Sequence, residues 1–238
     1  MLFGSDTPLR IRLENAWTAH LGAHCRFCHG AAATIPSLCD RCAANLPWLL
    51  TRCEKCARPL SFDGVCGACR QQPPICNSTH SSLRYTGDVV ILIHAVKFGG
   101  GLNLCSTLAT LMLKARRPIV FDQTQVVSVP LSQRRLRQRG FNQSLEIARQ
   151  LANQLQLEIF HRLRRTGQAP AQSSLKSARE RRRNVRSQFE LQGQAPVHAL
   201  IVDDVYTSGS TVQEIARVLR RHGSERIDVW TCARSVRA

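Results

Sequence analysis

The sequence predicts an α/β domain with a parallel sheet and helices on both faces, preceded by a small cysteine-rich domain at the N-terminus. Three observations support this class. Apolar segments of strand length alternate with amphipathic segments of helix length through the second half of the chain. Residues 199–202 are continuously apolar, as expected of a strand that helices cover on both sides. Finally, eight of the 11 cysteines lie close together, in regular pairs, near the N-terminus.

The paired cysteines predict metal binding. Each pair has the Cys-x-x-Cys spacing that lets two thiolates reach one Zn²⁺ at about 2.3 Å. The simplest assignment is two zinc ribbons in sequence, although the spacing also allows a crossed pairing or a single occupied site. We expect one or two structural zinc ions, because so small a block needs a metal to fold. The expected ligands are Cys25, Cys28, Cys39, Cys42, Cys53, Cys56, Cys66 and Cys69.

The rest of the chain divides into segments by periodicity and by Gly and Pro. Residues 71–80 resemble a linker, and residues 131–143 form a basic loop in this reading. Between 161 and 191 the chain is polar, rich in arginine and partly loop. We expect helices over 88–96, 102–117, 144–156 and 212–223, and strands over 125–130, 197–205 and 226–234.

Two adjacent carboxylates, Asp203 and Asp204, end the apolar strand and precede a short hydroxyl-rich turn. Backbone N–H groups at a helix start carry partial positive charge, so the turn suits a phosphate monoester. A capping box between Thr211 and Glu214 is the competing structural explanation. It does not account for the two acids, which need cations, hydroxyls or a hydrated Mg²⁺ as partners. The turn comprises Thr207, Ser208, Gly209, Ser210 and Thr211.

The charge of the chain favours anionic partners. It carries 33 Lys and Arg against 16 Asp and Glu, a formal net charge of +17. Between residues 131 and 190, 14 basic side chains face only four acidic ones. Such a cluster attracts polyanions or phosphorylated small molecules, although a solvated basic face would give the same count.

The N-terminus has neither the apolar core nor the cleavage site of a signal peptide. No apolar run approaches the roughly 20 residues that span a bilayer. We therefore expect a cytoplasmic protein without a membrane span.

The stretch IVDDVYTSGST, residues 201–211, resembles the 5-phosphoribosyl-1-pyrophosphate (PRPP) motif of type I phosphoribosyltransferases. The order of motifs along the chain is similar to that of the ComF (competence protein F) family: four Cys-x-x-Cys pairs, VKFGG, VSVPLSQRRLRQRGFNQ, ARERRRNV and then IVDDVYTSGST. The one departure is Ser128, where the family more often has proline.

The resemblance implies a type I phosphoribosyltransferase-like sheet preceded by a double zinc ribbon. The expected boundaries are 1–24 for an N-terminal helical segment, 25–76 for the double ribbon and 77–238 for the phosphoribosyltransferase-like domain. Asp203 and Asp204 would bind the ribose, and the turn 207–211 the 5′-phosphate, with Mg²⁺ accompanying PRPP. Pyrophosphate or DNA would contact Lys97, Arg137, Arg139, Gly140, Arg181, Arg182 and Arg183.

The resemblance also implies a role in the uptake or use of external DNA, in one of two forms. The protein is either a PRPP-binding phosphoribosyltransferase-like protein or a non-catalytic adaptor for single-stranded DNA. Catalysis itself stays open, but full amidophosphoribosyltransferase activity is excluded, because residue 2 is Leu rather than the nucleophilic cysteine that such enzymes need. No GxxxxGK[ST] loop occurs, so any motor, such as a helicase or DNA-uptake machinery, is a partner.

Overall fold

The computed structural model describes residues 24–32, 34–98, 101–166 and 188–236. By packing, the chain divides into two compact units, Met1–Leu46 and Pro47–Ala238. We describe each unit by itself. The first two cysteine pairs lie in the first unit, and the other two lie in the second unit with the sheet.

The first unit contains a tight cysteine turn followed by the short helix α2 (Asp40–Ala44). Cys39 caps this helix, because its sulfur accepts a hydrogen bond from the backbone N–H of Cys42. Ile35, Leu38 and Cys25 are buried and form its small interior.

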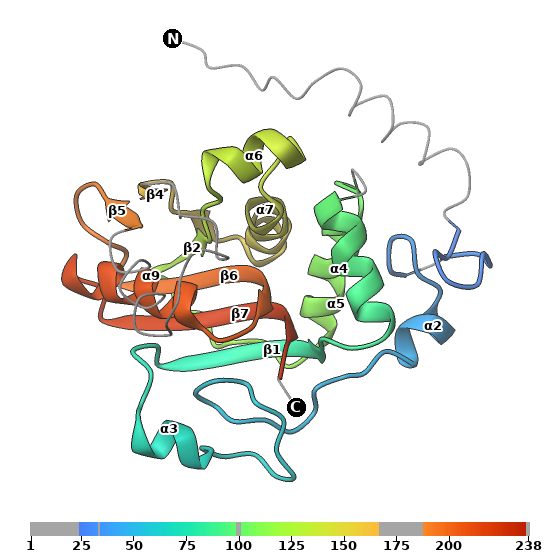
Figure 1. The fold of residues 1–238 in the computed structure, drawn as a ribbon, viewed down its shortest axis with the longest axis horizontal. Helices are drawn as coiled ribbons and strands as arrows, with labels where there is room; N and C mark the ends of the chain where they lie inside the picture. The colour runs from blue at the N-terminus through green and yellow to red at the C-terminus, as the bar shows by residue number, and fades with distance from the viewer. Residues whose placement is uncertain (1–23, 33, 99–100, 167–187, 237–238) are drawn as a thin grey trace, which may run out of the picture. The chain divides into compact units, whose positions relative to one another are not determined.

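A parallel sheet of five strands forms the centre of the second unit, in the order β1-β7-β6-β2-β3 (Figure 1). All four neighbouring pairs in this sheet are parallel. In a separate sheet, β4 pairs antiparallel with β5. The bounds are β1 Ser78–Arg84, β2 Thr124–Ser128, β3 Glu158–Ile159, β4 Leu163–Arg165, β5 Phe189–Leu191, β6 His198–Tyr206 and β7 Arg226–Arg234.

Helices cover both faces of the sheet, as the continuous apolar run predicted. Helices α5 and α7 pack on each other and against the sheet, while α9 packs against β7 and β5. Ile201 and Val229 point toward Ile215 and Leu219 of α9 in one buried cluster. Because successive strand residues face opposite sides, Leu200 belongs to the other face. The helices are α3 Gly67–Gln71, α4 Asp88–Phe98, α5 Leu104–Lys114, α6 Gln133–Arg139, α7 Gln143–Leu155 and α9 Ser210–Arg221.

Three segments differ from the sequence-based prediction. The expected basic loop at 131–143 contains α6, because Ser132 caps its start and Gly140 ends it in the left-handed conformation at φ 79°. The expected linker at 71–80 runs into β1, whose Thr, His and Ser residues gave no apolar alternation. The arginine-rich region contains β4 and β5 at its two ends.

The second cysteine block is joined to the sheet by hydrogen bonds from the backbone and the side chain of Thr79. Thr79 of β1 donates its N–H to the carbonyl of Glu54 at 2.8 Å and its hydroxyl to the carbonyl of Lys55 at 2.8 Å. This block therefore folds against β1. The expected N-terminal helical segment, 1–24, lies outside the described residues except for His24, and the domain boundaries expected from the sequence stay predictions.

No helix in the described parts of the chain is long and apolar enough to cross a membrane.

Candidate functional site: strand ends, a basic cavity and two cysteine tetrads

The candidate site lies at the carboxyl ends of β2 and β6, which are neighbours in the sheet. Ser128, the last residue of β2, is in register with Val202 of β6. The two acids that follow Val202 therefore lie beside the end of β2, where the chain continues into α6 and α7. In parallel sheets, ligands bind at this end of the strands.

Asp203 is held by two hydrogen bonds to the same carboxylate oxygen. Ser144 at the start of α7 donates its hydroxyl at 2.6 Å, and the backbone N–H of Asp204 donates at 2.9 Å. Burial, together with the neighbouring charge of Asp204, raises the pKa of Asp203 to about 7. Near neutral pH this carboxyl is therefore poised between its acid and its carboxylate, and a cation or hydroxyl ligand would favour the carboxylate.

Asp204 points to a different partner. Its Oδ2 lies 2.7 Å from the ammonium of Lys97 at the end of α4, and its Oδ1 accepts the N–H of Val205 at 2.8 Å. Asp204 is only 4% exposed, so the ion pair is shielded from water. The fold thus brings Lys97, predicted as a pyrophosphate contact, next to the predicted ribose-binding acids.

The turn after β6 has the exposure that a phosphate-binding loop needs. Thr207, Ser208 and Ser210 are exposed, and the hydroxyls of Ser208 and Ser210 lie 2.6 Å apart. Gly209 is the N-cap residue of α9 and has no side chain to cap it, although the hydroxyl of Ser208 accepts the N–H of Ser210 at 3.4 Å. The first N–H groups of α9 therefore lack helical partners.

The capping box between Thr211 and Glu214, the competing structural explanation of this turn, is not formed. The helix begins one residue before Thr211, and Glu214 instead makes a close ion pair with Arg217.

Gly209 is required by its surroundings. Its φ is 76°, in the left-handed region, and a Cβ there would lie 2.2 Å from the phenolic oxygen of Tyr206. The ring of Tyr206 thus lies directly under the turn, and only glycine lets the backbone pass over it.

The predicted basic residues on α6 differ in how far they are exposed to solvent. Arg139 is partly buried: its guanidinium donates to Gln143 at 2.9 Å and lies 5.4 Å from the ring centre of Phe98. Burial lowers the pKa of Arg139. Arg137 is exposed on α6, and Gly140 ends that helix. Arg181, Arg182 and Arg183 lie outside the described residues.

A cavity of about 850 Å³ lies beside Lys97 and Arg139. The sequence gave no reason to select most of its lining, although Phe98 and Phe141 directly follow the predicted residues Lys97 and Gly140. Four aromatic rings surround the basic groups. The cavity is lined by Tyr85, His94, Val96, Lys97, Phe98, Arg135, Gln138, Arg139 and Phe141.

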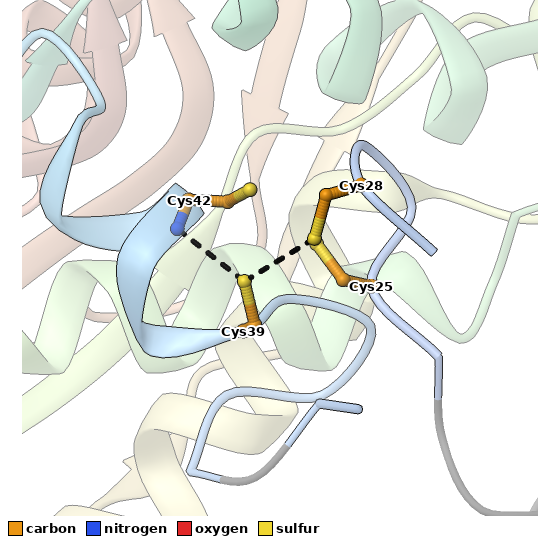
Figure 2. A group of neighbouring side chains, drawn as sticks. All are labelled: Cys25, Cys28, Cys39 and Cys42. Atoms are coloured by element: carbon orange, nitrogen blue, oxygen red, sulfur yellow. Dashed lines mark hydrogen bonds between the residues drawn. The ribbon is translucent and has the colours of Figure 1, made fainter. Parts of the chain in front are cut away.

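The eight predicted metal ligands form two tetrads, in the sequential and not the crossed arrangement. Within each tetrad the sulfur atoms all lie within 4.8 Å of one another. Figure 2 shows the first, where the sulfurs of Cys28 and Cys39 are 3.6 Å apart. Four converging thiols, with no other metal-binding side chain grouped with them in the described part of the chain, fit a closed, structural Zn²⁺ site.

One thiol in each tetrad is predisposed to ionise. Burial opposes this, but hydrogen bonds from the backbone N–H groups of Cys28 and Cys39 lower the pKa of Cys25 to about 6. In the second tetrad, burial again opposes the change, and the backbone N–H groups of Cys66 and Cys56 lower the pKa of Cys53 to about 7. Metal binding needs thiolates, so these backbone groups prepare both sites for zinc.

Comparisons with known proteins agree with this architecture. Residues 17–70 match the model of the double zinc ribbon domain, and residues 139–235 match that of the phosphoribosyl transferase domain. The competence protein F of Haemophilus influenzae is 31% identical over 224 residues, which cover 89% of this chain and 96% of that protein. The chain belongs to the ComF family.

Other relatives carry a different name. The DNA utilization protein YhgH of Salmonella typhimurium is 36% identical over 208 residues, covering 84% of this chain and 91% of that protein. The protein of the same name from Escherichia coli K12 is 35% identical over 208 residues, which again cover 84% of this chain and 91% of that protein. The ComF family assignment confirms the predicted fold: a parallel phosphoribosyltransferase sheet preceded by a zinc ribbon.

Proposed function

We propose that the strand end of β6 binds PRPP. Asp203 and Asp204 accept hydrogen bonds from the ribose hydroxyls, and the turn 207–211 binds the 5′-phosphate. The observation that carries this proposal is the order of groups at one strand end: a partly exposed carboxylate, Asp203, then the buried Asp204, and after two further residues an exposed hydroxyl turn that opens a helix. A neutral sugar would need no such turn, and a simple phosphate would need no paired acids.

The cations beside the acids fit the pyrophosphate of the same ligand. Lys97 and Arg139 line the adjoining cavity, and Arg137 and Gly140 lie on the same helix as Arg139 or at its end. In this proposal Mg²⁺ accompanies PRPP and neutralises part of its charge. Arginine suits pyrophosphate, because its planar fork donates two parallel hydrogen bonds.

If the ligand reacts, a nucleophile forms a bond to ribose C1 while the C1–oxygen bond to pyrophosphate breaks. The pyrophosphate leaves with the bonding electrons, and Lys97 and Arg139 stabilise the charge that it gains. The acids hold the ribose, so that C1 stays in line with the leaving group.

Calorimetric titration with PRPP and Mg²⁺ tests the binding. We expect heat from the natural chain, and a dissociation constant at least tenfold weaker for the Asp203→Ala/Asp204→Ala variant, since hydrogen bonds to charged groups contribute about 1.5–3 kcal/mol each. Asp122→Ala, which removes an exposed acid before β2, is the matched control. Absence of heat from the natural chain, or an unchanged dissociation constant in the double variant, would contradict the proposal.

From the names of its relatives, we propose that this protein acts in the uptake or use of external DNA. We also propose that it does so in the cytoplasm. Two relatives are named as DNA utilization proteins and one as a competence protein. A helicase or DNA-uptake machinery would supply the motor as a partner.

The cavity favours a second candidate: binding of single-stranded DNA. Phe98 is 73% exposed, with Arg139 over its ring and His94 5.5 Å from it, centre to centre. Aromatic rings stack with bases irrespective of sequence, and surrounding cations hold the phosphates.

Fluorescence anisotropy with a labelled oligo-dT strand tests this candidate. We expect affinity to fall steeply with salt, and Phe98→Ala to weaken binding about fivefold or more, in line with 1–3 kcal/mol per stacked base. Phe62→Ala is the control, because Phe62 is equally exposed, at 75%. A flat salt response, or equal losses in both variants, contradicts the adaptor role.

A further inference from the structure

Arg234, the last residue of β7, is a buried cation that no ligand proposal uses. It is 7% exposed, and its guanidinium bonds to carbonyl groups in two distant segments. Nε donates to the carbonyl of Cys56 at 2.8 Å. One terminal nitrogen donates to the carbonyls of Tyr206 at 3.0 Å and Thr207 at 2.7 Å. Arg234 therefore joins a cysteine of the second tetrad to the first residue of the phosphate turn.

The cysteine side of this link is itself fixed to the sheet. Cys56 follows Glu54 and Lys55, whose carbonyls accept both hydrogen bonds from Thr79. Three successive carbonyls of this cysteine turn thus accept hydrogen bonds from the sheet domain. These carbonyls belong to the turn that carries Cys53 and Cys56, two members of the second tetrad.

The turn side is equally constrained. Tyr206 is in register with Arg234, and the guanidinium lies 4.9 Å from the centre of its ring. The same ring lies under Gly209. A displacement of Arg234 would therefore move both the carbonyl of Thr207 and the ring that supports the turn.

We infer that Arg234 is a positioning residue that couples the second cysteine tetrad to the phosphate turn. Zinc in this tetrad holds the Cys56 carbonyl, Arg234 transmits that position, and the turn is preformed for the 5′-phosphate. This inference rests on the proposed PRPP site. The first tetrad, which lies in the other compact unit, has no part in the link.

Coupling between two sites is reciprocal. If zinc in the second tetrad organises the turn, PRPP bound at the turn must tighten zinc in that tetrad by the same factor. A residue with a merely structural role would lower stability without producing this ligand-dependent change.

The experiment measures zinc affinity by equilibrium competition with a chromophoric chelator, with and without PRPP and Mg²⁺. Cys39→Ser leaves the second tetrad as the tight site, and Cys66→Ser leaves the first. We expect PRPP to tighten zinc about fivefold or more in the natural chain and in Cys39→Ser, and to have no effect in Cys66→Ser. The control replaces PRPP with pyrophosphate in the presence of Mg²⁺. It measures how much zinc the pyrophosphate group of the ligand binds in solution.

Arg234→Lys keeps the charge but loses the fork that reaches the carbonyls of Cys56, Tyr206 and Thr207 together. We expect it to bind PRPP more weakly and to abolish the effect of PRPP on zinc affinity. Arg226→Lys, at the opposite end of the same strand, is the matched control and should retain the effect. Far-UV circular dichroism checks that both variants fold.

The outcomes separate the two proposals. Absence of PRPP binding to the natural chain contradicts the proposed function and, with it, the link. PRPP binding with unchanged zinc affinity in the natural chain overturns the link alone. A fivefold tightening that persists in Arg234→Lys shows coupling by another route and also overturns the role of Arg234.

Discussion

Asp203 gives the candidate site a pH dependence. Burial and the charge of Asp204 raise its pKa to about 7, and only the carboxylate attracts Mg²⁺ or accepts from two ribose hydroxyls. PRPP and Mg²⁺ binding should therefore strengthen as the pH rises through 7. The protonated fraction falls from about nine-tenths at pH 6 to about one-tenth at pH 8, which predicts an affinity gain of roughly tenfold.

Calorimetry at pH 6 and pH 8 measures this gain. PRPP titrates in the same range, so the comparison is with Asp203→Asn, which retains the ligand's own contribution and loses that of the side chain. The same pH response in both chains contradicts the assignment to Asp203.

Gly209 predicts a sharp steric effect. An alanine Cβ would lie 2.2 Å from the buried Tyr206 oxygen, so either the turn or the ring must move. We expect Gly209→Ala to weaken PRPP binding at least tenfold and to lower the free energy of unfolding by about 2 kcal/mol or more, from overpacking added to left-handed strain.

Gly87→Ala separates these two causes. Gly87 also has a positive φ, 52°, but a Cβ there meets nothing within 4 Å. We expect it to cost only about 1 kcal/mol in urea unfolding, with PRPP affinity retained. Equal losses of stability and affinity in both variants would mean that the approach to Tyr206 is unimportant.

At the scale of elements, polar side chains join the strands at the end opposite to the site. Asp228 of β7 is fully buried and accepts hydrogen bonds from Ser78 of β1 at 2.7 Å, His198 of β6 at 2.9 Å and Arg226 at 2.6 Å. The hydroxyl of Thr124 in β2 lies 2.6 Å from the other nitrogen of His198. This network connects four neighbouring strands of the sheet.

Asp228→Asn should destabilise the second unit. Although burial opposes it, hydrogen bonds from His198, Arg226 and Ser78 lower the pKa of Asp228 to about 2, below its value in an unfolded chain. Its stabilisation is therefore complete above about pH 4 and is lost as the pH falls through 2. At pH 7 we expect a loss of about 2 kcal/mol in urea unfolding.

Glu225→Gln, which changes an exposed acid just before β7, is the control and should leave the unfolding midpoint unchanged. An Asp228→Asn chain that is as stable as the control would show that the buried charge contributes nothing to the sheet.

For the whole molecule, the two tetrads lie in different compact units and should differ in their effect on the site. Loss of zinc from the second tetrad disturbs a segment bonded to β1 and, through Arg234, to the phosphate turn. We therefore expect Cys66→Ser to weaken PRPP binding at least fivefold and Cys39→Ser to leave it within about twofold. Calorimetry measures the affinities, and zinc analysis should find one ion in each variant. Equal losses of affinity would contradict this difference between the tetrads.

The sequence alone was enough to predict the two cysteine tetrads and the parallel sheet, and it singled out Asp203 and Asp204 with the hydroxyl turn that follows them. These depend on local spacing or on a continuous apolar run, so residues near in sequence were enough. It did not predict β1, because Ser and Thr side chains are buried there by partners such as Thr231, 150 residues away. The sequence analysis predicted a loop where α6 lies. The segment is mostly charged and lacks apolar periodicity, so the caps at Ser132 and Gly140 were not recognised.

Which distant groups come into contact could be seen only in the folded chain. The ion pair of Lys97 with Asp204, the Asp203–Ser144 hydrogen bond and the aromatic lining of the cavity depend on strand order and on the placement of α4, α6 and α7. The hydrogen bonds from Arg234 to the carbonyls of Cys56, Tyr206 and Thr207 likewise join segments far apart in the sequence. A sequence pattern records the chemistry of each segment, but contacts across such separations arise only when the sheet forms.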